Sequence, residues 1–186
     1  MKTYSLKGIL IILVVHISCN SYSPKAYIQY IKNPENGLTR NYTSKDYSYS
    51  LSFKPIELMA YQEWINNNKN VPYDSIFNQY IGLEYYGLDI KSLNPSNKKD
   101  SLSNQYKSFS FEHNIRLALG DSLRPALFHY ENTSGLKPAE HYEIAFEVNP
   151  GNTKDRIFMI HSYLIDNNIK LIIKHEDIQS IPKLKI

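Results

Sequence analysis

Hydrophobic and polar residues alternate most clearly over residues 47–54. The apolar positions are Tyr47, Tyr49, Leu51 and Phe53, and the polar positions between them are Ser48, Ser50, Ser52 and Lys54. A period of two places alternate side chains on opposite faces of a β-strand. The pattern therefore predicts a strand with one face packed on a core and the other in water.

Similar apolar patterns recur further along the chain. They predict strands at 80–92, 114–119, 123–130, 142–148, 156–161 and 169–174. The alternation slips near Gly87, which predicts a bulge there. Gly120-Asp121 is a tight-turn pair and predicts a hairpin that joins 114–119 to 123–130. Pro125 predicts an edge position or a bulge in the second of these strands.

Helical patterns are fewer. Pro55 ends the first strand, and an apolar stripe of Leu58, Tyr61, Trp64 and Ile65 predicts a helix over 56–67. Shorter helices are expected at 71–79 and 176–180. Residues 26–31 suit a helical turn and a strand equally well. Residues 101–112 carry both patterns, and we favour the helix.

Together these elements predict a mainly β protein with minor α (α+β). The expected architecture is an antiparallel β-sandwich, or a strongly curved sheet, of about seven strands with one to three short helices. No internal repeat of 20–50 residues is present, which disfavours solenoids and propellers.

The first 19 residues have a different character. Lys2 and Lys7 precede an uninterrupted apolar run over 8–15, and Ser18-Cys19 follows after His16-Ile17. A positive start, a short apolar core and a small residue before the cut are typical of a secretory signal. The apolar run is too short to span a bilayer, which needs about 20 residues.

Ser18-Cys19 resembles the lipobox of bacterial lipoproteins, although His16 stands where a Leu-like residue is commoner. That resemblance implies removal of residues 1–18 and a covalent lipid on Cys19. The alternative is an ordinary secretory signal that contains a cysteine. Cys19 is the only cysteine among the 186 residues. A lone cysteine in an exported chain makes no internal disulfide, and lipidation accounts for it.

The resemblance also implies a location and an anchor. Two or more acyl chains hold a protein stably on a membrane, whereas one holds it only reversibly. Asn20 is not the aspartate that marks retention at the inner membrane in such proteins, which favours the outer membrane. The expected organisation is a signal peptide at 1–18, a lipidated Cys19 with a tether and first turn over 19–44, and one β-rich domain over 45–186.

Charge adds little to this picture. Removing Lys2 and Lys7 with the signal leaves 19 basic and 18 acidic side chains. The lysines are scattered, so no clustered basic face of the kind that binds nucleic acid is expected. The sixteen tyrosines suit half-buried strands better than a binding surface. Tyr85 and Tyr86 are candidates for stacking on a sugar or peptide, but the strand explanation is preferred.

The chain lacks the short motifs of common enzymes: G-x-S-x-G, H-E-x-x-H and a glycine-rich phosphate loop. One pattern remains, a repeated tripeptide at His129-Tyr130-Glu131 and His141-Tyr142-Glu143. On paired strands, His129, Glu131, His141 and Glu143 share one face. Such a set suits a zinc site or acid–base chemistry. The plainer interpretation makes them polar fillers facing solvent, and no metal or other cofactor is expected besides the lipid.

The long segment 132–140 between the two tripeptides is the best candidate for a recognition loop. Three short stretches, Asn33-Pro34-Glu35-Asn36-Gly37-Leu38, Phe53-Lys54-Pro55 and Ile181-Pro182-Lys183-Leu184, resemble small uncharacterised lipoproteins of Gram-negative bacteria. That family brings no activity with it.

Three hypotheses follow for the function. The first is a non-enzymatic structural or protein-interaction module, tethered to the membrane and with a protein partner in the envelope. The second is a lipoprotein that binds a glycan or peptide. The third is a metal-dependent hydrolase that uses the two tripeptides.

Overall fold

The strand expected at 47–54 is present as β3 (Tyr47–Lys54), and its side chains alternate as predicted. Tyr47, Tyr49, Leu51 and Phe53 are buried, whereas the serines between them are half-buried on the opposite face. The computed structural model describes residues 21–94, 106–131, 139–162 and 167–186. Within them, β3 lies inside a five-stranded sheet and supplies much of its inner face.

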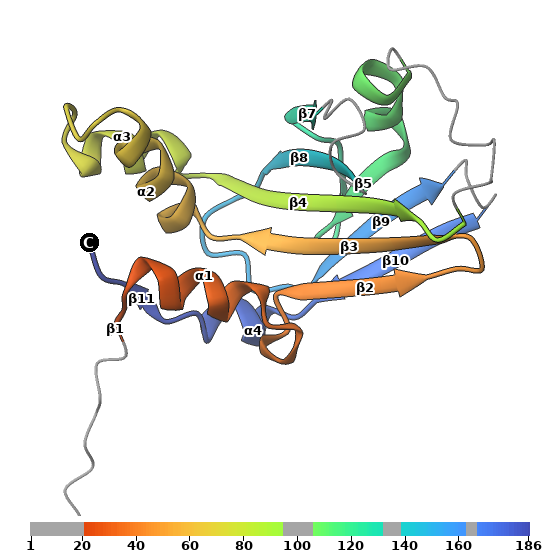
Figure 1. The fold of residues 1–186 in the computed structure, drawn as a ribbon, viewed down its shortest axis with the longest axis horizontal. Coiled ribbons are helices and arrows are strands. Elements are labelled where there is room, and N and C mark those ends of the chain that lie inside the picture. The colour runs from red at the N-terminus through yellow and green to blue at the C-terminus, as the bar shows by residue number, and fades with distance from the viewer. Residues whose placement is uncertain (1–20, 95–105, 132–138, 163–166) are drawn as a thin grey trace, which may run out of the picture.

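That sheet is antiparallel throughout (Figure 1). Its strands, in spatial order, are β2 (Thr39–Thr43), β3, β4 (Leu83–Ser92), β8 (Glu140–Glu147) and β7 (Leu127–Glu131). A second antiparallel sheet contains β10 (Asn167–Ile173), β9 (Arg156–Ser162), β5 (Ile115–Ala118) and β6 (Ser122–Leu123).

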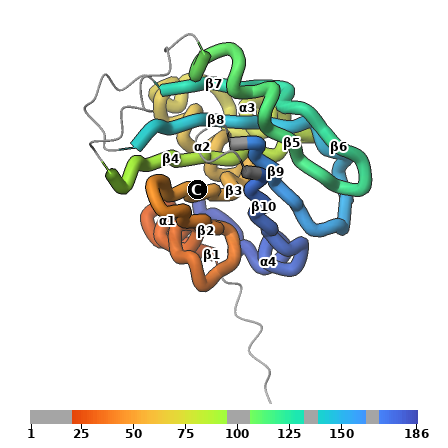
Figure 2. Tube along the Cα trace, turned by 90° about the vertical axis from the view of Figure 1, so that its right-hand side faces the viewer, coloured from red at the N-terminus to blue at the C-terminus, as the bar shows by residue number. Residues whose placement is uncertain are grey.

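The two sheets enclose the core, and Figure 2 shows them from the end. Phe158 of β9 meets Tyr86 of β4 and Phe146 of β8, with ring centroids 5.4 and 5.8 Å apart. At one corner, Arg40 Nε of β2 donates to the carbonyl of Ile172 in β10 at 2.7 Å. The mainly β, sandwich-like fold with minor α is therefore confirmed.

The expected strand over 123–130 is divided between the two sheets. Leu123 belongs to β6, which pairs with β5 across the turn at Gly120-Asp121. Leu127–Glu131 forms β7 and pairs with β8 in the other sheet. The division falls at Pro125, because proline offers no N–H to a β ladder. The prediction of one continuous hairpin partner was wrong.

The bulge predicted at Gly87 is also absent. β4 pairs without interruption with β3 and β8 over its whole length. The apolar pattern slips because Tyr86 and Leu88 face the core while Tyr85 is buried from the opposite side. Its ring lies 5.4 Å from that of Tyr80 in α3 (Tyr73–Tyr80). A helix covering the outer face thus produced the pattern that suggested a bulge.

The domain begins earlier than predicted. Residues 26–31 lie in a helix, α1 (Pro24–Lys32), in which Pro24 takes the first turn and the Ser23 hydroxyl accepts from the backbone N–H of Ala26. Tyr27 and Ile31 of α1 are buried in the core. The short 3-10 helix η1 (Pro34–Asn36) then leads into β2. Residues 24–43 are therefore part of the folded domain and not a tether.

The residues just before α1 also pair with the rest of the domain. β1 (Ser21–Tyr22) pairs in parallel with β11 (Lys183–Leu184), and the Lys185 N–H donates to the Tyr22 carbonyl at 2.8 Å. This small ladder joins the two ends of the described chain. The first described residue is thus already hydrogen-bonded to the rest of the domain.

The remaining helices are short. α2 (Ile56–Asn66) and α3 confirm the two helices predicted after β3, and α4 (His175–Gln179) confirms the turn near 176–180. The described part of the ambiguous segment, residues 106–112, lies in two helical turns, η3 (Tyr106–Ser110) and η4 (Phe111–Asn114). Among the described residues, no helix combines the length and the hydropathy needed to cross a bilayer.

Candidate functional site

The repeated tripeptides face each other on neighbouring strands. In the β7–β8 pair, His129 lies opposite Glu143 and Glu131 lies opposite His141. Tyr130 and Tyr142 point to the other face, where their rings pack 5.2 Å apart at the edge of the core. The strand pairing therefore places all four polar residues on the outer face of the five-stranded sheet.

Only three of the four come together. One ligand atom each of Glu131, His141 and Glu143 lies within 4.8 Å of the others. His129 is exposed and lies outside that group. The four-residue patch expected from the sequence is thus a three-residue cluster.

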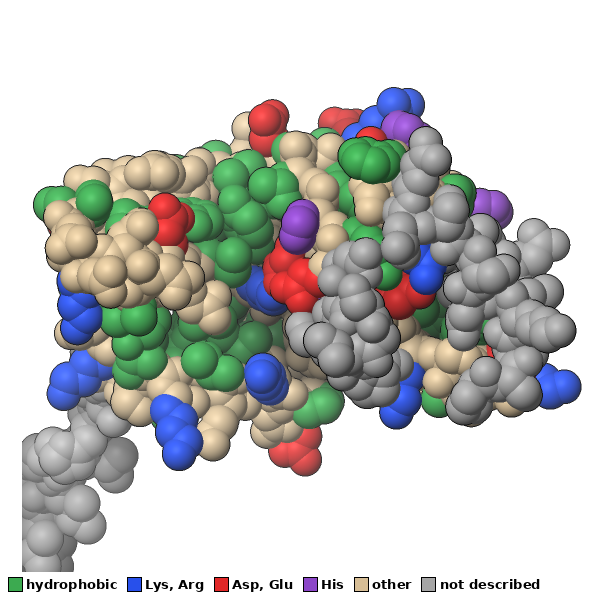
Figure 3. All heavy atoms as spheres, turned by 45° about the horizontal axis from the view of Figure 1, so that its top comes forward, with side chains coloured by type: hydrophobic (Ala, Val, Ile, Leu, Met, Phe, Trp, Pro, Cys, Tyr) green, Lys and Arg blue, Asp and Glu red, His purple; other side chains and the backbone are tan. Residues whose placement is uncertain are grey.

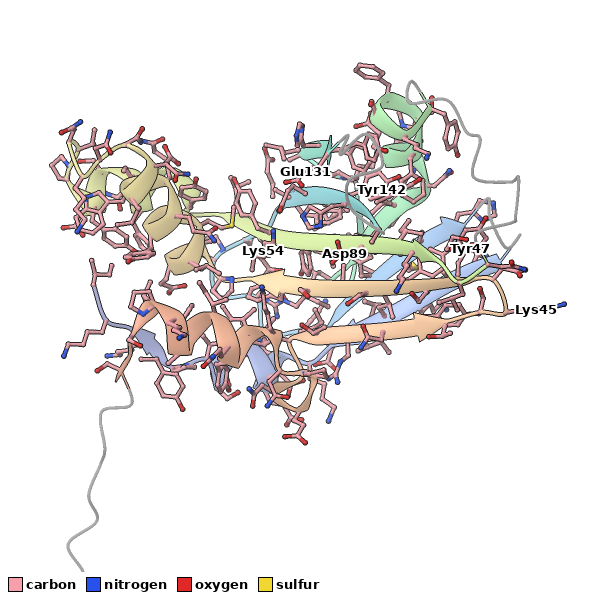
Figure 4. The ribbon with its side chains drawn as sticks, viewed as in Figure 1. Lys45, Tyr47, Lys54, Asp89, Glu131 and Tyr142 are labelled. Atoms are coloured by element: carbon pink, nitrogen blue, oxygen red, sulfur yellow. The ribbon has the colours of Figure 1, made fainter. Side chains whose placement is uncertain are left out.

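Two further residues complete the cluster from neighbouring strands. Asp89 of β4 lies opposite His141, and its Oδ1 is 2.6 Å from His141 Nδ1. His141 Nε2 is 2.7 Å from Glu143 Oε1, which also accepts from Lys54 Nζ of β3. Figure 4 labels Lys54, Asp89 and Glu131, which come from three different strands. We call Lys54, Asp89, Glu131, His141 and Glu143 the outer cluster.

Sequence reasoning missed Lys54 and Asp89. Both are polar residues of predicted strands, so the alternation of apolar and polar residues indicated that they face outward. Nothing local indicated that β3, β4 and β8 would be neighbours in that order. Their contacts with Glu143 and His141 span 89 and 52 residues of chain.

Gly87 gives the cluster the room it needs. It lies on β4 opposite Glu143 on one side and Ser52 on the other. A Cβ atom at this position would stand 2.9 Å from Lys54 Cε and 3.3 Å from His141 Cε1. The bare backbone of β4 therefore lets Lys54 of β3 reach Glu143 of β8, and it leaves room for the His141 ring beside them.

The charges of the cluster reinforce one another. Hydrogen bonds to Asp89 and Glu143 raise the pKa of His141 to about 9, so it is an imidazolium at neutral pH. Burial raises the pKa of Glu143, but hydrogen bonds from His141 and Lys54 outweigh burial and lower that pKa overall. Glu143 Oε2 is buried and accepts no hydrogen bond from any described residue.

A shallow hollow of about 400 Å³ opens beside the cluster. It is lined by Ser48, Ser50, Asp89, Lys91, Glu131 and His141, with Ala139 at one side. Figure 3 shows acidic, histidine and lysine side chains gathered on this face, next to hydrophobic ones. The hollow offers hydroxyl, carboxylate and cationic groups together, which suits a ligand with several hydrogen-bonding groups.

The cluster is less suited to catalysis at neutral pH. Both ring nitrogens of His141 are occupied by carboxylates, and an imidazolium is not a general base. A metal ion would have to remove the proton of His141 and displace Lys54 from Glu143, because ligating histidine is neutral. In the structure, Lys54 and His141 supply the positive charge that faces Glu143.

A second polar network lies between the sheets. Arg156 of β9, which is 4% exposed, donates from Nε and Nη2 to Glu84 of β4, with Nη2 to Oε1 at 2.6 Å. The Tyr86 hydroxyl donates to Glu84 Oε2 at 2.8 Å. Arg156 also donates to the carbonyls of Lys154 and Asn152. We call Arg156, Glu84 and Tyr86 the inner network.

Two other sequence candidates have different outcomes. Tyr85 and Tyr86 are buried, which leaves neither ring open for stacking on a ligand. Cys19 and most of the predicted recognition loop, 132–138, lie outside the described residues. Comparisons with protein-family models, curated proteins and solved structures found no significant match to this chain.

Proposed function

We propose that this protein is a lipid-anchored module of the bacterial cell envelope that binds a partner without catalysing a reaction. Support comes first from the N-terminal pattern: Lys2 and Lys7, the apolar run 8–15, and Ser18 before the lone Cys19. A lipid on Cys19 would be the only non-protein group required. The absence of aspartate at position 20 favours the outer membrane over the inner.

The observation that carries the proposal is the position of the first strand. β1 begins at Ser21, so Asn20 alone separates it from Cys19. Two residue steps of extended chain span at most about 7 Å. A lipid on Cys19 would therefore hold the domain directly at the membrane surface. A module held so close serves partners at that surface, such as another envelope protein.

The outer cluster and its hollow are the proposed binding surface. The groups around the hollow include two carboxylates, Asp89 and Glu131, and two cations, Lys91 and His141. Their charges balance at neutral pH, so an uncharged polar ligand meets little repulsion. A glycan or a peptide segment has this chemistry and is the alternative to a protein partner.

Mass spectrometry of the protein from its native host tests the anchor. We expect the wild type to begin at an acylated Cys19, and Cys19→Ala to be uncleaved or released from membranes. Asn20→Ala is the matched control and should be processed and acylated as the wild type is. An unmodified Cys19 in the wild type would contradict the proposal and leave an ordinary exported protein.

A metal-dependent hydrolase is the second candidate, favoured by the convergence of Glu131, His141 and Glu143. Zinc titration by calorimetry tests it, with Glu131→Gln against the control Glu147→Gln, an exposed residue of the neighbouring strand β8. A metal site predicts binding that Glu131→Gln weakens at least tenfold and Glu147→Gln leaves unchanged. Binding that is absent, or equal in both variants, would eliminate the hydrolase.

A further inference from the structure

The end of the domain that carries β1 is rich in lysine. β1, β11 and α1 lie together there (Figure 1). The segments 21–40 and 174–186, which form this end, contain six Lys and Arg residues but three Asp and Glu residues. The intervening 41–173 contain 13 basic and 15 acidic side chains. The positive charge of the domain is therefore concentrated in the segments around the start of the described chain at Ser21.

Four of these cations have no acidic partner. Arg40 pairs with Asp177, and Lys174 pairs with Glu176. Lys25, Lys32, Lys183 and Lys185 are exposed and form no ion pair with any described residue. We call these four lysines the basic anchor face.

The fold fixes where two of them stand. Lys183 lies opposite Ser21 in the β1–β11 ladder, and the backbone of Lys185 is bonded to Tyr22. Lys25 lies in the first turn of α1, three residues after Tyr22. Lys25 and Lys32 share the exposed side of α1, because positions seven apart fall on one helix face. The buried side of the same helix carries Tyr27 and Ile31.

We propose that the basic anchor face rests on anionic phospholipid headgroups when Cys19 is acylated; this inference depends on the proposed lipid anchor. The chain keeps Ser21 within about 7 Å of Cys19, which the lipid would hold at the membrane. That distance is shorter than the Debye length of about 8 Å at physiological salt. Lysines at that distance feel the negative surface potential of a bilayer. Each contributes roughly a fivefold gain in surface binding. In this orientation the basic anchor face, and not the outer cluster, meets the bilayer.

Lysine acylation of the lipid-anchored protein in vesicles tests the orientation. The full protein is reconstituted in neutral phosphatidylcholine vesicles and in vesicles with a third phosphatidylglycerol, and the labelling rate of each lysine is read by mass spectrometry. We expect Lys25, Lys32, Lys183 and Lys185 to react about tenfold more slowly on anionic vesicles. Lys91 and Lys170, exposed on the outer faces of the two sheets, are internal controls and should not change.

A variant separates contact with lipid from simple shielding. Lys25→Gln/Lys183→Gln/Lys185→Gln removes three charges and leaves Lys32 as the reporter. Protection of Lys32 on anionic vesicles should fall to its value on neutral vesicles, whereas Lys91→Gln/Lys170→Gln should leave that protection intact. In 1 M salt, where the Debye length is about 3 Å, protection in the wild type should also disappear.

The outcomes distinguish the two proposals. An acylated Cys19 with equal lysine labelling on both vesicle types would overturn the lipid-facing orientation and leave the anchor standing. A protein without the acyl group would overturn both. Slower labelling of Lys25, Lys183 and Lys185 that depends on charge would establish the basic anchor face as a membrane contact.

Discussion

The outer cluster and the inner network are built from the same kinds of residue but in different surroundings. Each centres on a glutamate of a central strand that meets a cation from another strand: Glu143 with Lys54, and Glu84 with Arg156. The side chains of Arg156 and Glu84 are 5% and 12% exposed, whereas Asp89 of the outer cluster is 50% exposed. The inner network therefore joins the two sheets, and the outer cluster lies at the surface of one of them.

The two also differ in how completely they are hydrogen-bonded. Arg156 has five donors and reaches Glu84 and two backbone carbonyls, while Tyr86 reaches the second oxygen of Glu84. In the outer cluster, Glu143 Oε2 has no described partner. An unpaired buried oxygen carries a desolvation cost, so the outer cluster is the less completely satisfied of the two. Substitutions in and around both regions test this difference.

Arg156→Met should have the largest effect. It leaves Glu84 buried without its cation, and breaking a buried pair in this way costs about 3–5 kcal/mol. Urea unfolding should show that loss. Lys170→Met, an exposed lysine on the neighbouring strand β10, is the control and should change stability by less than about 0.5 kcal/mol.

A second variant identifies the cause of that loss. Arg156→Met/Glu84→Met removes both charges, and we expect it to recover at least half of the stability lost in the single variant. A single variant that loses less than about 1 kcal/mol would show that the inner network is not what joins the sheets.

His141→Gln tests the outer cluster through its pH dependence. The pKa of His141 is raised from 6.5 to about 9, so the folded state binds this proton more tightly than the unfolded chain. The stabilisation is complete below pH 6.5 and is lost as pH rises through 9. At pH 6 we expect the free energy of unfolding of the wild type to exceed that of the variant by about 1–2 kcal/mol. This is less than the full pKa shift would give, because solvent screens the charge of the half-exposed Asp89.

Urea unfolding of both proteins between pH 6 and pH 10 measures this dependence. The difference between them should fall towards zero near pH 10. Ser48→Ala, a substitution on the same outer face that removes no titratable group, should show no such trend. A difference that stays constant across this range would mean that the protonated ring is not what the cluster stabilises.

Two tyrosines allow the same chemical change in opposite situations. Tyr27 and Tyr86 are both fully buried, but the Tyr86 hydroxyl donates to Glu84 whereas the Tyr27 hydroxyl has no hydrogen-bond partner among the described residues. Removing an unpaired buried hydroxyl relieves a desolvation cost. Tyr27→Phe should therefore raise the free energy of unfolding by about 1 kcal/mol, and Tyr86→Phe should lower it by a similar amount. Thermal or urea unfolding that gives both variants the same sign would contradict this interpretation.

The sequence predicted the parts of both regions that depend on local periodicity. β3 and β8 were recognisable because apolar and polar side chains alternate along them, and the two tripeptides fell on paired strands as expected. Residues 26–31 were ambiguous, because apolar side chains there stand at spacings that suit both a helix and a strand. The helix is decided by packing of Tyr27 and Ile31 on the core.

The contacts that define each network were not predictable in the same way. Lys54 meets Glu143 and Arg156 meets Glu84 across 89 and 72 residues of chain, and such contacts depend on strand order. Strand order is set by the whole core, and no motif near these residues records it. The false bulge at Gly87 has a local cause, because Tyr80 at the end of the preceding helix α3 covers the outward side of Tyr85 and interrupts the pattern.

Gly87→Ala should have the smallest effect on stability, and it perturbs the outer cluster without touching the inner network. The new Cβ would lie 2.9 Å from Lys54 Cε, at the end of a flexible side chain that can move away. Alanine in a strand gains about 0.5–1 kcal/mol over glycine, and the lost contact between Lys54 and Glu143 offsets much of it. The net change in unfolding free energy should be under about 0.5 kcal/mol.

The pKa of Glu143 in Gly87→Ala should nevertheless rise, because the hydrogen bond from Lys54 helps to lower it. Carboxyl NMR titration measures that rise, and Lys54→Met should reproduce it without altering Gly87. An unchanged pKa in Gly87→Ala would show that the outer cluster does not need the bare backbone, whereas a rise would show that the bare backbone lets Lys54 reach Glu143 and lower its pKa.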